Sequence, residues 1–141
     1  MNKTVKAVLT ITTFIIICVL IILVTKSLRD KQRREEDKLY STLNTVVKEF
    51  YRDYYYSTVL GSDDNTRKIN AETYKTSGIS YTLDEIAKYK IGEENTILEQ
   101  FKNYRTNLPC DYKNTKITIY PHEPYGSEDI RIESNIVCGF K

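Results

Sequence analysis

The sequence of 141 residues has no tryptophan, one histidine, three cysteines and five glycines. The lone His122 lies between prolines in a predicted loop, which is typical of a solvated side chain and leaves no second histidine for a zinc site. The glycines form no phosphate-binding loop or dinucleotide fingerprint, and a nucleophile elbow and a paired-histidine helix are also missing. We therefore expect no cofactor, no metal and no small-molecule substrate.

The acidic clusters have simple structural explanations. The run Ser62-Asp63-Asp64-Asn65 lacks the spaced ligands and the closing glutamate of a calcium loop, and turn chemistry explains it better. The pairs Asp84-Glu85 and Glu93-Glu94 stand at predicted helix starts, where the helix dipole favours negative charge. Because no nucleophile, base and orienting group come together, the sequence predicts a protein that is not an enzyme.

One long apolar run dominates the N-terminal part. Nineteen uncharged residues, 7–25, separate Lys6 from Lys26, and as a helix they span about 28 Å, close to the hydrocarbon thickness of a bilayer. The alternative is a cleaved signal peptide, since Lys3 and Lys6 form a short basic region. The run exceeds a usual signal core, however, and no small-x-small cleavage site follows it. We predict a cytoplasmic N-terminus at 1–6 and a single transmembrane helix at 7–25.

Two other processing routes fit the sequence less well. A lipoprotein would use Cys18, but Ile17 occupies the preceding place, where a small residue is expected. A type IV prepilin site needs a glycine before the apolar run and usually a glutamate within it, and this sequence has neither.

Charge is distributed unevenly along the chain. Residues 1–38 hold eight basic and four acidic side chains, whereas residues 39–141 hold thirteen and fifteen. The acidic distal part argues against a nucleic-acid partner. The basic excess lies beside the apolar run, where we expect anionic lipid headgroups to bind it. The predicted headgroup ligands are Lys26, Arg29, Lys31, Arg33 and Arg34.

The side of the membrane that holds the C-terminal part is contested within the sequence. The basic flank after residue 25 would place that part in the cytoplasm. Long segments, however, cross largely regardless of charge, and the paired cysteines described below suit an oxidising compartment. We expect an extracytoplasmic C-terminal domain on a cell membrane.

The long N-terminal helix is predicted to continue beyond the membrane as an amphipathic helix over residues 26–60, ending before Gly61. Its first part has mixed charges, and a kink at Ser27 is possible because Ser27 and Asp30 can start a fresh helix. Its second part has an apolar stripe at helical spacing. The stripe can pack on the protein's own C-terminal domain, part of it can contact other copies or partners, and both can hold at once because a long helix has several faces. The stripe consists of Leu39, Leu43, Val46, Val47, Phe50, Tyr51, Tyr54 and Tyr55.

Residues 61–141 are predicted to form a small head. The stretch 66–80 is irregular and indicates a loop with at most one helical turn. Thr82 and Glu85 form a capping box, which predicts a short helix to Tyr89, and residues 93–105 have the pattern of a second helix. Residues 116–120 and 130–136 alternate as half-buried strands do, and the turn-rich stretch between them predicts a hairpin. Two strands alone are marginally stable, so the stripe of the preceding helix is expected beneath them.

Two cysteines flank this hairpin. Cys110 precedes it, and Cys138 is in phase with the inward-facing isoleucines of the second strand. A small head profits from a covalent link, and a disulfide between them would contribute about 3 kcal/mol in the chain-entropy model. In the cytoplasm the two side chains would stay buried thiols.

The predicted α+β architecture resembles type IV pilin-like proteins, including the pseudopilins of tight-adherence pili. The features that carry the resemblance are the apolar run 7–25, the amphipathic helix 39–60, the hairpin 116–138 and the two cysteines. The resemblance implies a structural subunit of a bacterial surface or secretion apparatus, which packs against its own copies or other subunits. The alternative is a membrane-anchored adaptor of a secretion or conjugation machine, which acts through contacts of the head.

Overall fold

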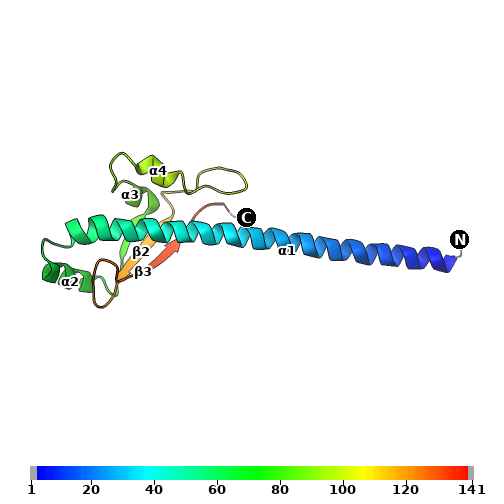
Figure 1. Ribbon diagram of the computed structural model, residues 1–141, viewed down its shortest axis with the longest axis horizontal. Coiled ribbons are helices and arrows are strands. Elements are labelled where there is room, and N and C mark those ends of the chain that lie inside the picture. The colour runs from blue at the N-terminus through cyan, green and yellow to red at the C-terminus, as the bar shows by residue number, and fades with distance from the viewer. Residues whose placement is uncertain (1–2, 140–141) are drawn as a thin grey trace. The chain divides into compact units, whose positions relative to one another are not determined.

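The computed structural model describes residues 3–139, and the side chains of residues 3–8 and of Thr10 lie outside that description. The expected N-terminal segment 1–6 therefore falls outside the described side chains. The chain divides into two units, of which the first ends at Lys38 and the second begins at Leu39. The fold is α+β (Figure 1), with the elements α1 (Lys3–Phe50), the π-helix η1 (Tyr51–Val59), α2 (Asp64–Thr73), β1 (Ile79–Thr82), α3 (Leu83–Ala87), α4 (Glu94–Leu98), β2 (Lys116–Pro121) and β3 (Ile130–Asn135).

The first unit is the N-terminal part of α1. Its helical backbone runs unbroken through Ser27, so the alternative of a fresh helical start there is not realised. The charged stretch that follows the apolar run stabilises itself locally. Gln32 donates a hydrogen bond to Glu36, and Lys38 forms an ion pair with Glu35 at 2.8 Å, at the spacings that bring helical side chains together.

The helix of the second unit changes its hydrogen-bonding pattern at Tyr51. Up to Phe50 the buried side chains follow α-helical spacing, and beyond it Phe50, Tyr55 and Leu60 are buried at intervals of five, as are Tyr51 and Tyr56. This interval matches a π-helix, in which each N–H bonds five residues back, and the N–H of Leu60 indeed donates to the carbonyl of Tyr55. The prediction of one α-helix over 26–60 is therefore wrong for its last turns. Gly61, with φ of 145°, follows the end of the helix as expected.

The stretch 66–80 is not the predicted loop, because it contains α2 and the start of β1. Asp63 caps α2 by accepting a hydrogen bond from the backbone N–H of Thr66 at 3.0 Å. The helix has only one buried residue, Ala71, and its one large apolar side chain, Ile69, is exposed. It therefore lacks the apolar stripe by which a helix is recognised in a sequence.

The sheet has three antiparallel strands in the order β1-β2-β3, so the predicted two-stranded hairpin gains a third strand. Ile119 of the central strand pairs with Ile79 of β1 and with Ile132 of β3. On the inner face Ile117 and Ile119 are fully buried, and on the outer face Lys116 is exposed. This alternation confirms the period of two that predicted β2 and β3.

The core of the second unit lies between the inner face of the sheet and the helical stripe that begins at Leu39. Leu43, Val47 and Tyr51 of the helix are fully buried in the same cluster as Ile117 and Ile119. Residues 39–60 thus belong to the compact unit of the head, whereas the sequence placed the start of the head at residue 61.

The two short helices start close to where the sequence predicts, but both end earlier than predicted. Thr82 and Glu85 form the expected capping box at the start of α3, although this helix ends at Ala87. The helix predicted over 93–105 is wrong beyond Leu98. The side-chain oxygen of Asn103 accepts hydrogen bonds from the N–H groups of Arg105 and Thr106, so it competes with the helical backbone for these donors.

The register of the π-helix predicts unequal costs for two neighbouring tyrosines. Tyr56 is 7% exposed and Tyr54 is 40% exposed, whereas a continued α-helix would bury Tyr54. We expect Tyr56→Ala to lower the free energy of unfolding by about 3 kcal/mol and Tyr54→Ala by about 1 kcal/mol or less. Denaturant unfolding of the full chain in detergent measures both. Equal costs, or a larger cost at Tyr54, would contradict the π-helical register.

Candidate functional site

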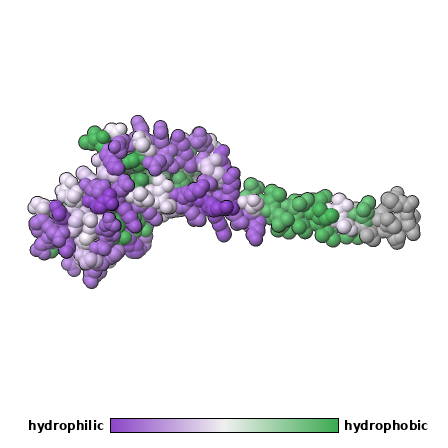
Figure 2. Space-filling view, in the orientation of Figure 1, coloured by the Kyte–Doolittle hydropathy of each residue, from purple (hydrophilic) through white to green (hydrophobic). Residues whose placement is uncertain are grey.

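The apolar run of α1 is the largest uncovered apolar surface among the described residues. Its large side chains between residues 9 and 24 are each about half exposed or more, and Figure 2 shows this part of the helix as mostly hydrophobic, with a paler band within it. Thr13 donates its hydroxyl to the carbonyl of Leu9 and Thr25 donates to that of Ile21, so these hydroxyls are satisfied within the helix. The described part of the chain has one helix long and apolar enough to cross a membrane, near the N-terminus.

The predicted headgroup ligands follow this run directly, and all five are exposed. Between residues 26 and 34 the helix has one carboxylate, that of Asp30. Within the described residues Arg34 donates to the backbone carbonyl of Asp30, and no carboxylate forms an ion pair with Lys26, Arg29, Lys31 or Arg33. These four charges are thus available to an anionic surface, and three acids follow them at residues 35–37.

The predicted interaction stripe is covered by the protein's own head. Seven of its eight members are buried in the core cluster, and only Tyr54 is exposed. Of the two alternatives for the stripe, packing within the chain is therefore the one that the structure shows for these seven side chains. A contact with other proteins remains a prediction, and it requires surfaces other than this stripe.

An aromatic cluster surrounds Phe50 where α1 becomes η1. The rings of Tyr81 and Tyr89 meet the Phe50 ring edge-on, at centroid distances of 5.1 and 5.6 Å. Tyr81 also meets Tyr55 edge-on at 6.0 Å. Because Tyr81 belongs to β1 and Tyr89 follows α3, these contacts join the sheet and the short-helix region to the long helix.

Burial raises the pKa of several of these tyrosine phenols. Burial, followed by the proximity of Tyr56, raises the pKa of the Tyr51 phenol far above its usual value. For Tyr55 the raised pKa again comes first from burial and then from Tyr81. Within the described chain the Tyr51 hydroxyl has no hydrogen-bond partner. These phenols therefore stay neutral in the core, where they have a packing role.

The C-terminal segment is fastened to the loop after α4 by a covalent bond and by hydrogen bonds. Cys110 and Cys138 form the expected disulfide, and both side chains are buried. Beside it Asn103, itself buried, donates to the carbonyl of Cys138 at 2.8 Å and to that of Gly139 at 3.2 Å. Both polar atoms of the Asn103 amide thus have partners, two for the nitrogen and two for the oxygen.

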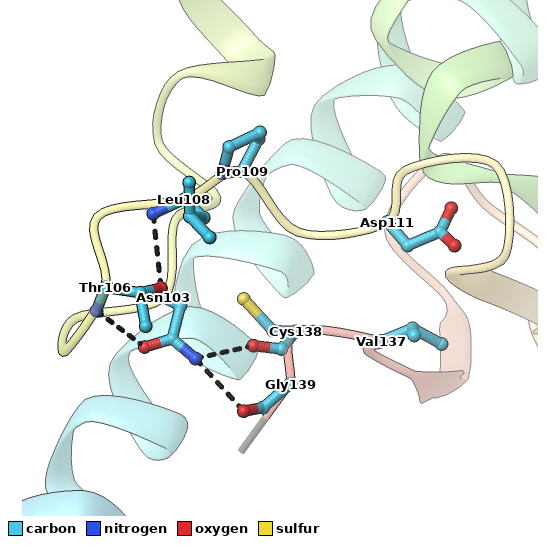
Figure 3. Close-up of a pocket in the computed structure, with 8 residues that line it drawn as sticks. All are labelled: Asn103, Thr106, Leu108, Pro109, Asp111, Val137, Cys138 and Gly139. Atoms are coloured by element: carbon cyan, nitrogen blue, oxygen red, sulfur yellow. Dashed lines mark hydrogen bonds between the residues drawn. The ribbon is translucent and has the colours of Figure 1, made fainter. Parts of the chain in front are cut away.

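A shallow pocket of about 290 Å³ lies at this junction (Figure 3). Asn103 lies at its centre, with Thr106 and Leu108 on one side and Cys138 and Gly139 on the other. The hydrogen-bonding groups of Asn103 are used within the chain, and Asp111 is the one charged residue in the lining. The pocket therefore offers shape but few free polar groups to a ligand.

A second hollow of about 310 Å³ lies between the long helix and the region of α3 and α4. Glu49 and Lys90 form an ion pair across it at 3.1 Å, and the hydrogen bond that Lys90 donates to Glu49 is the main cause of the raised pKa of Lys90. Both side chains are more than one-third exposed, so the pair adds little stability. Among the described residues no group of three metal-binding side chains is found.

The outer face of the sheet is polar and has its own contacts. The guanidinium of Arg131 lies over the Tyr120 ring at 4.3 Å and pairs with Glu133 on the same strand. Ser80 of β1 and Thr118 of β2 share a hydrogen bond between their side chains.

Comparison of the chain with known protein families, curated proteins and solved structures found no match.

Sequence reasoning found the disulfide but missed Asn103, whose role depends on a loop that the sequence presented as a helix. It also missed the inward Tyr56. The interval of five among Phe50, Tyr55 and Leu60 was a usable signal, because it departs from the spacing earlier in the helix.

The Asn103 amide predicts a measurable weak point of the head. We expect Asn103→Ala to lower the free energy of unfolding by about 2–3 kcal/mol, because it leaves four backbone groups without this partner. It should also speed reduction of the Cys110–Cys138 disulfide by dithiothreitol. Asn95→Ala, at an exposed position of α4, is the matched control and should change neither quantity. Equal behaviour of the two variants would contradict the role given to Asn103.

Proposed function

We propose that this chain is a single-pass membrane protein of the cell surface that works as a structural subunit of a pilin-like or secretion apparatus. The observation that carries the proposal is the division of α1 into two kinds of surface. Residues 11–24 present large apolar side chains to the surroundings, whereas from Leu39 onwards the side chains of the apolar stripe are buried in the core of the head, except that of Tyr54. The first surface needs a bilayer or other apolar helices around it, and the second does not.

A lipid bilayer fits the N-terminal surface because the helix satisfies its own backbone and the hydroxyls of Thr13 and Thr25. The basic side chains of Lys26, Arg29, Lys31, Arg33 and Arg34 then lie where anionic headgroups begin, and each contributes about 1 kcal/mol to attraction near such a surface. The acids at 35–37 follow directly after them. This order of apolar, basic and acidic segments supports an anchor that stays in the membrane.

A pilin-like role is supported by the way in which the head is built on the anchor helix itself. The stripe from Leu39 to Leu60 forms one layer of the head core, and the sheet forms the other. A pilin-like subunit also needs its anchor to pack against other anchors. The exposed apolar side chains before Val24 leave that surface open.

The alternative role is that of an assembly adaptor, which holds other subunits of a secretion or conjugation machine through contacts of the head. The polar outer face of the sheet and the exposed Ile91, which is 95% exposed beside Gly92, favour it. Under either role the partners are proteins and membrane lipid, and the proposal assigns the head no reaction, cofactor or metal.

We further propose that the head lies outside the cytoplasm. The disulfide between Cys110 and Cys138 supports this placement, because such bonds persist in oxidising compartments and are rare in the reducing cytosol. The basic flank at residues 26–34 favours the opposite side, but long segments cross largely regardless of such charges.

Crosslinking through the anchor tests the structural role. Single cysteines at each position from Leu20 to Val24, in a Cys18→Ser background, are oxidised in membranes. In a pilin-like subunit we expect crosslinks between copies with a helical period, because one face of the anchor contacts its neighbour. Cys18→Ser alone is the control and should give none.

The outcomes of this experiment separate the two roles. Crosslinks that join the chain only to other proteins would favour the adaptor. Recovery of the uncleaved chain in the soluble fraction without detergent would overturn the membrane anchor, and with it both roles.

Topology has its own test. Lys113→Cys lies in an exposed turn of the head, and Asn2→Cys precedes the anchor in the sequence; both are made in the Cys18→Ser background. We expect a membrane-impermeant maleimide to label Lys113→Cys on intact cells and Asn2→Cys only after lysis. The reverse pattern would place the head in the cytoplasm.

A further inference from the structure

The strand β3 has one edge that no other described strand occupies, since the sheet order is β1-β2-β3. Along β3, the backbone groups of successive residues point alternately to β2 and to the free edge. Which residues bond to β2 follows from the end of the ladder, where the N–H of His122 donates to the carbonyl of Asp129 in the same register. Odd-numbered residues of β3 therefore bond to β2. The N–H and C=O groups of Ile130, Ile132 and Ser134 are directed to the free edge.

The opposite edge of the sheet is protected. β1 has only four residues, and by the same alternation Ser80 and Thr82 face away from β2. The N–H of Thr82 is taken by the Glu85 carboxylate at 2.7 Å within the capping box. Of the two outward N–H groups of β1, only that of Ser80 is left to bond to a further strand, so this edge offers too little backbone for one.

The β3 edge keeps more of its backbone free. The N–H of Ile130 bonds locally to the carbonyl of Glu128. Those of Ile132 and Ser134 have no such partner among the described residues. Two adjacent outward N–H groups on one strand are what a further antiparallel strand requires.

We propose that the free edge of β3 pairs antiparallel with β3 of a second copy of this chain. The sequence of the strand, Ile-Arg-Ile-Glu-Ser, complements itself when Ile132 stands opposite Ile132 of the second copy. The two Ile132 residues exchange backbone hydrogen bonds. The N–H of each Ser134 reaches the carbonyl of Ile130 of the other copy.

Charge complementarity fixes this register. With Ile132 at the centre, Arg131 stands opposite Glu133 of the second copy, and Glu133 stands opposite Arg131 of that copy. Both side chains are more than half exposed and lie on the outer face, and they form non-hydrogen-bonded pairs, in which side chains approach most closely. The four charges alternate in sign along and across the two strands.

Neighbouring registers lose this complementarity. A shift by two residues in one direction places Glu133 opposite Glu133 of the second copy, and in the other direction it places Arg131 opposite Arg131, so like charges meet. A shift by one residue places Ile132 opposite a charged residue of the outer face, so the two apolar faces no longer coincide. The register centred on Ile132 is therefore the one that satisfies both the charges and the apolar face.

The same register extends the apolar face. Ile132 is only partly buried at the rim of the core, and its counterpart in the second copy would cover it on the open side. The two strands are related by a two-fold axis, so the contact closes as a pair and leaves no further edge of this kind. The result is one six-stranded antiparallel sheet shared by two heads.

This inference rests on the assembly role proposed above and names a second copy as the partner of the head. It is tested on the full chain in detergent by the oligomeric state, measured by sedimentation. We expect a dimer for the natural sequence. Ser134→Pro removes an N–H that faces only the free edge, a place that tolerates proline, and should weaken the dimer about tenfold or more. Ser134→Ala keeps the N–H and is the matched control.

A charge exchange tests the register. Arg131→Glu places carboxylates opposite each other and should weaken the dimer, and Glu133→Arg should do so with the opposite sign. The double variant restores both cross-strand pairs in reversed order and should restore the dimer. The unfolding free energy of each variant shows that the head itself is intact.

The outcomes separate this inference from the structural role. A monomeric natural chain, or a dimer unchanged by Ser134→Pro, would overturn the pairing through β3. If the anchor crosslinks described above persist in that case, the structural role stands and copies meet through their anchors. Strong binding of a foreign extended segment to a monomeric head would likewise overturn self-pairing.

Discussion

Packing of the apolar stripe of the long helix against the three-stranded sheet is the contact on which the head depends. The apolar inner face of the sheet is covered by side chains that begin at Leu39, and the burial of both apolar surfaces holds the strands to the helix. The same helix has no such cover over its described apolar N-terminal run. One continuous element therefore supplies both the core of the head and a surface that needs another environment.

The π-helix η1 lets this packing continue where an α-helix would lose it. In α-helical register Tyr54 would follow Phe50 onto the core face. The wider turn instead brings in Tyr55 and Tyr56 together, and Tyr56 then bonds to Asp64 at the start of α2 at 3.1 Å. Through these contacts the end of the long helix is joined to the chain that returns towards the sheet.

Much of the fold could be predicted from the sequence because the signals are local. The apolar run, the alternation of β2 and β3, the capping box at Thr82 and the inward phase of Cys138 each need only a few neighbouring residues. What could not be predicted depends on tertiary contacts. Helix α2 buries only Ala71, and β1 exists because it pairs with β2. The helix after Glu94 ends early because Asn103 binds the loop and the C-terminal segment at once.

The headgroup and partner assignments had no such local geometry to decide them, since they concern surfaces that face outward. The stripe illustrates the ambiguity, because an amphipathic pattern is equally compatible with an internal and an external partner, and burial in the head decided it for seven of the eight residues.

The wide turn at η1 also bears on how the length of this chain can change. A π-helical turn holds about one residue more than the α-helical turn it replaces, so losing one residue between Tyr51 and Val59 would return one of the wide turns to ordinary winding without breaking the helix. The aromatic side chains beyond the deletion would nevertheless rotate around the axis relative to the sheet. Insertions and deletions are therefore far better accommodated in the turn after Gly61 than within these nine residues.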